Sequence, residues 1–557
     1  IVGAGTSCDL VVRMHYEKDC TLTTYVQAAD GNWSASGAMP AESEAEYGLY
    51  KRAMALSARY SDGSLVGVGS GVTTPSPSAI FEMIRFGRCI SDQLAAGARF
   101  NHWRKVKTPD GDGWINLSAA NVRVYSDADF PEWAGWSFIK DDPTPDSLCD
   151  SPTVKRWLDV NNSGHLTHAD AVGALSTDEV KQRLSHAVCK FPTEWSRDGL
   201  SDRYLWLKSP HEALSNPLSD TDFSTLMEHA RVLGFWEDIV DVDLPPADQC
   251  WHLPPAAFLG QLRTCGWFSK AEFKQILPME VLREGPHHAM YYETVRGMAS
   301  SFLEDNLLPL NRSLRKYLIN TPSRISSFFG NALEETQWFG KLHENNSTEW
   351  YYPWDGRGFL QLTGPDNYIS YWDFIGRGPQ ISQQTRTKLH DAYKAASADR
   401  AHAQSHIGDT VSGVTPAMIG WRASVGGGDN NPPTSDDQLF PSDSAGFYWL
   451  KMEMARYADR DINLQRREVS ATKPPQHHHP DPSPAVQKVY YHSDNFHDAS
   501  AAVNYPAGVG NQNSTFNGYV ARCIGFAQTL AVVGEPWFSD AQGALLPFPE
   551  ARQPRRD

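Results

Sequence analysis

The sequence predicts a multi-domain protein with a β-rich N-terminal part, a small α-helical domain and a mainly α-helical C-terminal domain. The chain has 557 residues, which corresponds to about three or four domains of ~150 residues each. Apolar residues make up 41% of the chain and charged residues 21%, a balance that allows buried cores and excludes global disorder. Two stretches rich in Pro and Asp, at 141–152 and 241–250, separate segments of different pattern.

Composition also excludes several classes of protein. The net charge of −16 argues against a nucleic-acid-binding protein, which needs a basic surface. The longest apolar stretches fall short of the ~18 residues of a membrane helix, so we expect no membrane span. The eight cysteines are too sparse for a disulfide scaffold and contain no CxxC pair. One or two disulfides are compatible with this number, and Cys8 and Cys20 are the closest pair in the sequence.

Residues 1–142 form the predicted β-rich region. Short runs of alternating polarity, such as 10–14 and 122–125, are separated by clusters of Asp, Gly, Ser and Pro. The segment HWRKVKTPDGDGWINLS (102–118) contains two strand-like runs around a Pro-Asp-Gly-Asp-Gly turn. This segment resembles a bacterial SH3-type module, and an ordinary β-hairpin accounts for it equally well.

Residues 143–247 are predicted to form a helical domain with an EF-hand-like loop. The segment DVNNSGHLTHAD (159–170) has oxygen-bearing residues at the ligand positions of such a loop and Gly164 at the sixth position, where the loop turns sharply. The predicted Ca²⁺ ligands are Asp159, Asn161, Ser163, His165, Thr167 and Asp170. Asp170 replaces the usual bidentate Glu, which weakens affinity and allows Mg²⁺ to compete. Because the loop is single, we expect a structural role; the alternative is a turn that binds no metal.

The mainly α-helical C-terminal domain is predicted to span residues 266–546, after a linker at 248–265 and before a tail at 547–557. Thr321 is a good N-cap and Pro322 suits the first helical position, so a helix should begin there. At 100° per residue one face of this helix is apolar, and it comprises Ile325, Phe328, Phe329, Ala332, Thr336 and Phe339.

Two glutamates near the end of this helix differ in their expected surroundings. Glu335 lies at the margin of the apolar face, where partial desolvation suits a carboxyl group to act as a general acid. Glu334 points to the opposite face and is expected to be solvated.

Glu344 follows Glu335 by nine residues, which on one uninterrupted helix would place the two carboxylates on opposite faces. They can share a cleft only if the helix ends between them, and we expect it to end at Gly340. An inverting glycosidase needs such a pair roughly 6.5–9.5 Å apart, so that the base can hold a water on the far side of the sugar.

Five segments together resemble the family 19 glycoside hydrolases, in the order in which that family has them. They are FSKAEFKQILP (268–278), the helix pair that leads to Glu335, DGRGFLQLTGPDNY (355–368), SAGFYWLKMEMARYADRD (444–461) and FNGYVAR (516–522). The family includes chitinases, phage endolysins and bacterial wall-lytic enzymes. The resemblance therefore implies a lysozyme-like fold for most of 266–545.

The resemblance also implies roles for individual residues. Glu335 matches the general acid, Glu344 the general base, and Thr363 a hydroxyl residue that helps the base to hold its water. The predicted substrate-binding residues are Gln361, Asn367, Arg357, Trp338 and Tyr352. Arg357 and Gln361 have an alternative role in holding the fold rather than contacting sugar. No cofactor is needed for this chemistry.

Two features depart from the family pattern. The family usually has His immediately before the acid, and here that residue is Glu334. Residues 466–490 are expected to be an insertion, whose Pro- and His-rich stretch at 473–484 can only be a loop. Three consecutive histidines, 477–479, either chelate a metal or are solvated, and we expect the second.

Three hypotheses for function follow. The first is a muramidase-type glycosidase that hydrolyses the β-1,4 glycan backbone of peptidoglycan with inversion; the second is a chitinase with the same chemistry. The third is a catalytically silent protein that binds or is delivered to the cell wall. Both carboxylates argue against the third, and the lack of a Cys-rich chitin-binding module argues against the second.

The domain organisation resembles type VI secretion effectors and phage lysins. This resemblance implies synthesis in a bacterial cytoplasm without a signal peptide, delivery from the cell, and action on the wall in the periplasm of a target cell. The implied partners are glycan strands, a component of the secretion machine and an immunity protein that blocks the cleft. What residues 1–100 contact does not follow from the sequence.

Overall fold

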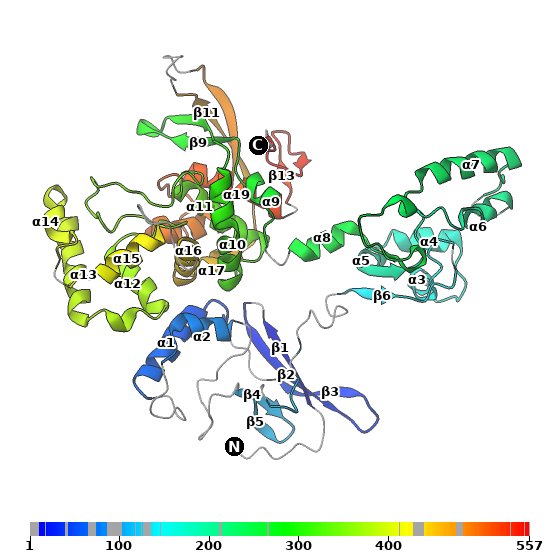
Figure 1. Ribbon diagram of the computed structural model, residues 1–557, viewed down its shortest axis with the longest axis horizontal. Coiled ribbons are helices and arrows are strands. Elements are labelled where there is room, and N and C mark those ends of the chain that lie inside the picture. The colour runs from blue at the N-terminus through cyan, green and yellow to red at the C-terminus, as the bar shows by residue number, and fades with distance from the viewer. Residues whose placement is uncertain are drawn as a thin grey trace. The chain divides into compact units, whose positions relative to one another are not determined.

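The computed structural model of the chain resolves into two units (Figure 1). Unit 1 comprises Ile1–Arg123 and Thr264–Asp557, and unit 2 comprises Val124–Arg263. The structure describes residues 10–16, 18–38, 43–64, 74–85, 103–116, 119–123, 125, 135–144, 146–210, 214–263, 267–411, 413–426, 439–474, 483–534, 536–550 and 552–555. Unit 2 is therefore an insertion between two segments that belong to one unit.

A small β-structure forms the beginning of unit 1. Strands β1 (Leu10–Tyr16), β2 (Cys20–Gln27) and β3 (Trp33–Ala38) make an antiparallel sheet in the order β1-β2-β3. The hairpin expected within 102–118 is present as β4 (Trp103–Thr108) and β5 (Gly111–Asn116). Cys20, Leu22 and Val106 are buried between the two parts. The hairpin thus packs against the small sheet of β1–β3. Its likeness to an SH3-type module stays a prediction.

Two helices lie inside the region that we expected to be β-rich. They are α1 (Leu49–Ser61) and α2 (Pro77–Ile84), and their apolar faces pack into the main core of unit 1. Phe81 stacks on Tyr317 with ring centroids 5.7 Å apart, and Arg324 is paired with Glu46, just before α1. The spacing of Leu49, Ala53, Leu56 and Tyr60, all buried, is the helical signal that marks α1 in the sequence.

The remainder of unit 1 is mainly α-helical, as expected. It is built around α11 (Pro322–Glu335) and α19 (Tyr519–Val533), which lie side by side (Figure 1). A Cβ on Gly525 would lie 3.4 Å from the Cα of Gly330, so the two helices cross closely at these glycines. The other helices of this part are α9 (Lys270–Gln275), α10 (Ser300–Lys316), α12 (Pro365–Phe374), α13 (Gln383–Ala398), α14 (Gln404–Ile407), α15 (Pro416–Val425), α16 (Phe440–Lys451), α17 (Met454–Ala458) and α18 (Asp494–Asn504).

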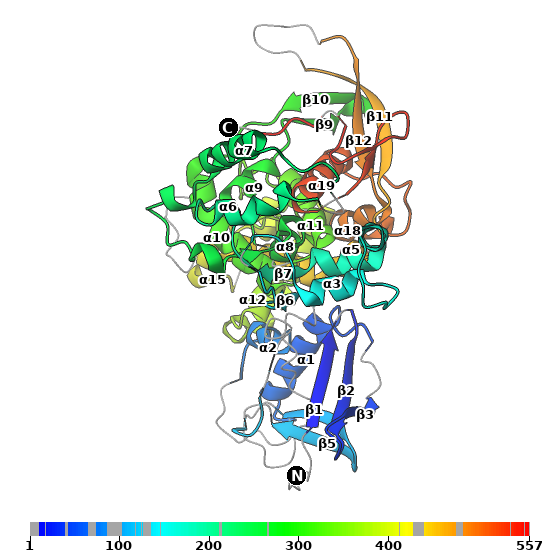
Figure 2. The same cartoon turned by 90° about the vertical axis from the view of Figure 1, so that its right-hand side faces the viewer.

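A four-stranded sheet lies against α19. It contains β9 (Glu280–Glu284), β10 (Met290–Thr294), β11 (Gln465–Thr472) and β12 (Val486–His492) in the order β12-β11-β10-β9, with β10 and β11 parallel and the other pairs antiparallel. Figure 2 shows β11 and β12 side by side. The expected insertion at 466–490 is thus largely this hairpin, whereas 475–482, with the three histidines, lie outside the described residues. A two-stranded ribbon, β13 (Phe538–Ser539) with β14 (Leu545–Leu546), follows α19.

Unit 2 has its own small sheet and core. Strands β6 (Ser137–Ile139), β7 (Ala187–Lys190) and β8 (Trp251–His252) pair in that order, β6 with β7 in parallel. Its helices are α3 (Pro152–Leu158), α4 (His168–Leu175), α5 (Asp178–Ser185), α6 (Leu200–Tyr204), α7 (Asp220–Leu233) and α8 (Pro255–Arg263). Because β6 and β8 belong to this sheet, the unit begins before our expected boundary at 143 and extends beyond 247.

Candidate functional site

Glu335 is the last residue of α11. Thr321 caps the start of this helix by accepting a hydrogen bond from the Arg324 N–H, and Pro322 occupies the first turn, as expected. The apolar face expected for the helix is buried from Ile325 to Phe339. The Glu335 side chain keeps 18% of its surface exposed, so α11 presents this carboxylate at the edge of the core.

Arg522 on α19 holds Glu335 in place. Its Nη2 donates to Glu335 Oε1 at 2.8 Å and to Asn504 Oδ1 at 3.0 Å, while its Nη1 donates to Asn331 Oδ1 at 3.0 Å. The Arg522 side chain is 4% exposed, so this charge acts in a largely water-excluded place. Sequence reasoning selected the FNGYVAR segment but missed Arg522 as a site residue.

Tyr448 is a second neighbour of Glu335 that sequence reasoning missed. Burial, together with the nearby Glu335 carboxylate, raises the pKa of Tyr448 on α16, so its hydroxyl stays protonated at neutral pH.

The chain turns sharply after Glu335, and the helix ends there rather than at Gly340. Gln337, Trp338 and Phe339 all have positive φ, at 51°, 60° and 63°, and the Phe339 N–H donates to the Thr336 hydroxyl at 3.1 Å. The expectation that the helix ends between the two glutamates is confirmed, but its position was wrong by five residues. Because of this turn, Glu335 lies on α11 and Glu344 on the loop that follows.

Glu344 lies on a loop that pairs with the Gly-Arg-Gly turn. Its N–H donates to the Gly356 carbonyl at 2.9 Å, and the Gly358 N–H donates to the Leu342 carbonyl at 2.8 Å. The Glu344 carboxylate accepts from the Tyr351 hydroxyl at 2.9 Å and from the Gly356 N–H at 3.1 Å. Both carboxylate oxygens therefore have a fixed donor, one on each side.

Asp355 ties this loop to Arg357. It is fully buried, contacts His343 Nε2 at 2.8 Å, accepts from the Asn345 N–H at 3.1 Å and is paired with Arg357 at 3.0 Å. Burial raises the pKa of Asp355, but the hydrogen bond from His343 and the charge of Arg357 outweigh burial and keep this pKa below its usual value. Asp355 thus fixes the loop that carries Glu344, and sequence reasoning did not single it out.

The predicted substrate-binding residues are mostly engaged within the fold. Arg357 is buried and donates to the Pro353 carbonyl at 3.0 Å and to the Tyr368 hydroxyl at 3.3 Å. The Gln361 amide donates to the Gly358 carbonyl at 2.8 Å. Both contacts fit the alternative in which these two residues hold the turn.

Thr363 and Asn367 form a short chain of hydrogen bonds beside that turn. The Thr363 hydroxyl donates to the Gln361 carbonyl at 2.8 Å. The Asn367 amide donates to the Thr363 carbonyl at 2.9 Å and accepts from Lys451 at 3.0 Å. A hydroxyl that donates to a carbonyl keeps its lone pairs, so Thr363 retains the capacity to accept from a water.

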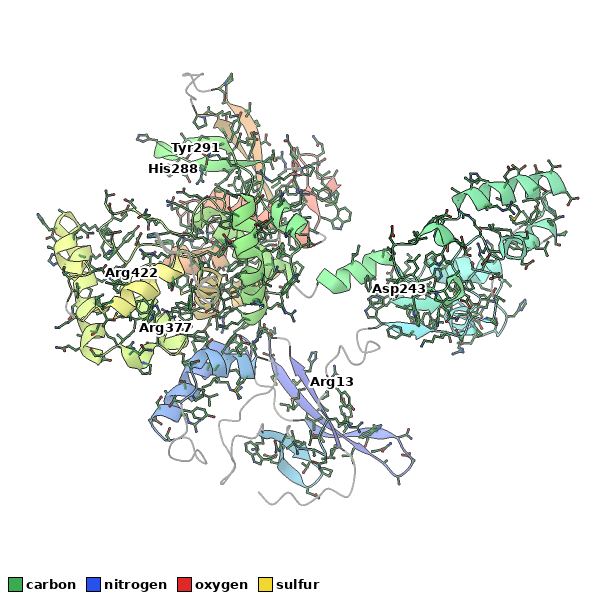
Figure 3. The ribbon with its side chains drawn as sticks, viewed as in Figure 1. Arg13, Asp243, His288, Tyr291, Arg377 and Arg422 are labelled. Atoms are coloured by element: carbon green, nitrogen blue, oxygen red, sulfur yellow. The ribbon has the colours of Figure 1, made fainter. Side chains whose placement is uncertain are left out.

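The two predicted aromatic contacts differ in exposure. Trp338 is only 7% exposed, so no sugar can stack on its indole unless the turn moves. Tyr352 lines a pocket of about 260 Å³ together with Arg357, Gln404, Asp409 and Arg422. Arg422, labelled on α15 in Figure 3, donates to both carboxylate oxygens of Asp409 at 2.8–2.9 Å. The lining of this pocket includes neither Glu335 nor Glu344.

Glu334 is not solvated, contrary to our expectation. Its side chain is 12% exposed and accepts from Arg283 Nη1 on β9 at 2.6 Å. A Cβ on Gly518 would lie 2.7 Å from Glu334 Oε1, so the loop before α19 covers the carboxylate directly. Strand β9 and this loop therefore bury the face of α11 that its own sequence pattern predicts to be exposed to solvent.

The loop at 159–170 joins α3 to α4 in unit 2. Asp159 accepts from the N–H groups of Ser163 at 3.0 Å and Gly164 at 2.8 Å, and these bonds, chiefly that of Gly164, lower its pKa. Thr167 and Asp170 form a capping box at the start of α4. The helix-loop-helix context expected for the loop is therefore present.

The donor set of this loop fits a hard cation. Asp159, Asn161, Ser163, Thr167 and Asp170 would supply side-chain oxygens, and His165 at the seventh position would supply its carbonyl. Within the described ranges, no group of three or more His, Cys, Asp or Glu side chains is arranged around a common metal position. Only two of the predicted ligands, Asp159 and Asp170, are carboxylates. The remaining ligands of a bound ion would therefore be neutral oxygen atoms.

Comparisons of the chain with protein-family models, curated proteins and solved structures find no match. Among the described helices, none combines the length and the hydropathy needed to cross a membrane.

Proposed function

We propose that the chain is an inverting glycosidase that hydrolyses the β-1,4 backbone of peptidoglycan, with Glu335 as general acid and Glu344 as general base. The observation that carries the proposal is the end of α11 at Glu335, after which the loop of Glu344 pairs with the Gly-Arg-Gly turn. A two-carboxylate mechanism places the acid and the base on opposite sides of the scissile bond, and two carboxylates on separate segments, each held by its own donors, are compatible with that arrangement.

The surroundings of each carboxylate suit its proposed task. The acid gives its proton to the glycosidic oxygen, and Arg522 stabilises the carboxylate that results. The base takes a proton from the attacking water, and Tyr351 and the Gly356 N–H fix its orientation while lone pairs on both oxygens stay available. Thr363 is the proposed second acceptor for that water.

The cellular setting of the proposal rests on the resemblance to type VI effectors and phage lysins. The enzyme would be made in a bacterial cytoplasm and act on the wall of a target cell, with an immunity protein in the producer. Chitin is the alternative substrate, and a silent wall-binding protein is the alternative of another class. Engagement of Arg357 and Gln361 within the fold is the observation that favours the silent alternative.

Mass spectrometry of the soluble products from purified peptidoglycan tests the proposal, with colloidal chitin in parallel. We expect muropeptides with new reducing ends from the wild type and a loss of about 10³-fold for Glu335→Gln. Glu304→Gln, an exposed carboxylate on α10, is the matched control and should retain activity. Chitin oligomers alone would assign the second substrate, and no product from either polymer by folded protein would leave the silent alternative.

We further propose that the loop at 159–170 binds Ca²⁺ in a structural role. Ca²⁺ at about 100-fold above its Kd should stabilise unit 2 by roughly 2.7 kcal/mol. Asp159→Asn should abolish this gain, whereas Asp243→Asn, exposed in the same unit (Figure 3), should retain it. Thermal unfolding with Ca²⁺, Mg²⁺ and chelator measures the effect, and equal curves in all three would contradict the proposal.

A further inference from the structure

Two thiols of unit 2 lie together although 40 positions separate them in the chain. Cys149 is exposed and lies between β6 and α3, and Cys189 is half-buried in β7. Their side chains are in hydrogen-bond contact. Cys250, the third thiol described in this unit, is buried and donates to the Pro246 carbonyl, so it does not compete for either partner.

The fold itself brings the two cysteines together. Cys189 lies opposite Ile139 in the parallel pairing of β7 with β6. Asp141 and Asp142 directly follow β6, and they bind the segment after Cys149: the Asp150 N–H donates to Asp142 at 2.7 Å, and the Thr153 N–H to Asp141 at 3.0 Å. These bonds from backbone N–H groups to the two carboxylates hold the segment of Cys149 beside the end of β6, the strand that pairs with the strand of Cys189.

The two thiols are chemically unequal. The hydrogen bond from Cys189 lowers the pKa of Cys149; burial opposes this shift and the Ser151 N–H supports it. The same hydrogen bond, together with burial, raises the pKa of Cys189. The charge of Asp142 disfavours both thiolates; Asp150 adds to this effect at Cys149 and Asp141 at Cys189. Because Cys149 is exposed and Cys189 is half-buried, Cys149 is the thiol that an oxidant reaches first, and Cys189 is the resolving thiol.

We propose that Cys149 and Cys189 form a reversible disulfide by exchange with a disulfide oxidant, either oxidised glutathione or a protein disulfide. The Cys149 thiolate attacks one sulfur of the oxidant and releases the other as a thiolate. Cys189 then loses its proton to solvent and attacks Cys149 Sγ, which releases the second oxidant sulfur. Two protein thiols are oxidised and one oxidant disulfide is reduced to two thiols.

The disulfide would close the segment that contains α3, the loop at 159–170, α4 and α5. Cross-linking a loop of this length lowers the unfolding equilibrium constant of the unit on the order of 100-fold, mainly by restricting the unfolded chain. The disulfide would therefore act as a clamp. Unit 2 would be less stable towards unfolding in a reducing cytoplasm, where both thiols are free, than in an oxidising compartment, where the disulfide forms. This inference is independent of the catalytic proposal, because it concerns unit 2 alone.

Peptide mapping of the full-length protein tests the proposal. The reduced protein is equilibrated with oxidised and reduced glutathione, its free thiols are blocked with iodoacetamide, and it is digested without reduction. We expect the cross-linked peptide pair of Cys149 with Cys189 in the wild type and in Cys250→Ser, and its absence in Cys149→Ser. A single glutathione adduct on Cys149 without the cross-link, or a cross-link from Cys149 to any other cysteine, would overturn the proposal.

Limited proteolysis supplies a second readout, which distinguishes a clamp from an incidental bond. Oxidation should slow cleavage within 150–188 by at least 10-fold, and dithiothreitol should restore it. Cys149→Ser, a change at an exposed position, should show no response to dithiothreitol. Equal cleavage of oxidised and reduced wild type would contradict the clamp.

Discussion

Two consecutive glutamates end α11, and each has an arginine of its own. Glu335 is bound by Arg522 from α19, and Glu334 is bound by Arg283 from β9. Glu334 Oε2 is buried and has no hydrogen-bond partner within the described structure. An ionised carboxylate in that position is costly, because one oxygen has lost water without a replacement.

The pH dependence of stability should report the buried state of Glu334. Burial raises its pKa more than Arg283 and Arg522 lower it, so Glu334 contributes stability below its unfolded pKa, and this contribution is lost as the pH rises through its folded pKa. Glu334→Gln carries no such titration. We therefore expect the melting temperature of Glu334→Gln, relative to wild type, to increase between about pH 4.5 and 8.

Thermal unfolding of both proteins across this range measures the difference. A difference that stays flat, or that grows as the pH falls, would show that Arg283 fully compensates the buried charge.

Sequence reasoning predicted the partial burial of Glu335 and missed the burial of Glu334 for a physical reason. A helical projection counts only the apolar residues of the helix itself, and Glu335 borders that stripe. What covers the other face of α11 comes from β9 and Gly518, about 50 positions before Glu334 and 184 positions after it. Burial by distant segments leaves no periodic signal near the residue that it buries.

Helix α16 approaches the end of α10 more closely than any side chain would allow. A Cβ on Gly446 would lie 2.0 Å from the Tyr317 ring. This approach lets the Tyr317 hydroxyl donate to Asp443 at 3.0 Å, a buried carboxylate that also accepts from Lys316 and Tyr371, each at 2.8 Å. Gly446 therefore connects helix packing to a buried polar network.

Gly446→Ala should destabilise unit 1 by about 3 kcal/mol, because the methyl group displaces Tyr317 and its hydrogen bond. Gly420→Ala on α15 is the matched control, since nothing lies within 4 Å of its Cβ position; it should be neutral or stabilise by up to about 1 kcal/mol. Chemical denaturation of the two variants provides the comparison. Equal stability would show that Tyr317 relaxes at no cost.

At the scale of elements, helix beginnings were easier to predict than helix ends. Thr321 and Pro322 mark the start of α11 by local chemistry alone. Its end depends on three residues with positive φ, a conformation stabilised by the packing of Trp338 and Phe339 into the core. α1 was missed although its apolar spacing is visible, because the surrounding segments read as strands.

Unit 1 as a whole is discontinuous in sequence. Seven core residues come from α1 and α2, which precede the inserted unit: Leu49, Ala53, Leu56, Tyr60, Ile80, Phe81 and Ile84. Each large apolar side chain among them contributes about 1.5–3 kcal/mol by burial. Their sum is comparable to the ~5–15 kcal/mol that holds a domain folded.

A fragment of residues 264–557, which contains the domain expected from sequence at 266–546, should therefore not fold cooperatively. It should bind a hydrophobic dye and lack a sharp thermal transition. A fragment of residues 43–557 keeps α1 and α2 and omits only β1–β3, so it should unfold cooperatively. Near-ultraviolet circular dichroism and calorimetry distinguish the two, and a native-like 264–557 would show that α1 and α2 are dispensable.

The insertion of unit 2 also sets an order of events during synthesis. Glu46 leaves the ribosome 278 residues before its partner Arg324, and at ~5–20 residues per second the interval lasts tens of seconds. Throughout that time the apolar faces of α1 and α2 lack the core residues against which they pack in the folded protein. Unit 2, whose sequence lies between, can already fold on its own three-stranded sheet. In the nascent chain unit 2 can thus fold before unit 1 is complete, and α1 and α2 are buried only after segments that are made much later.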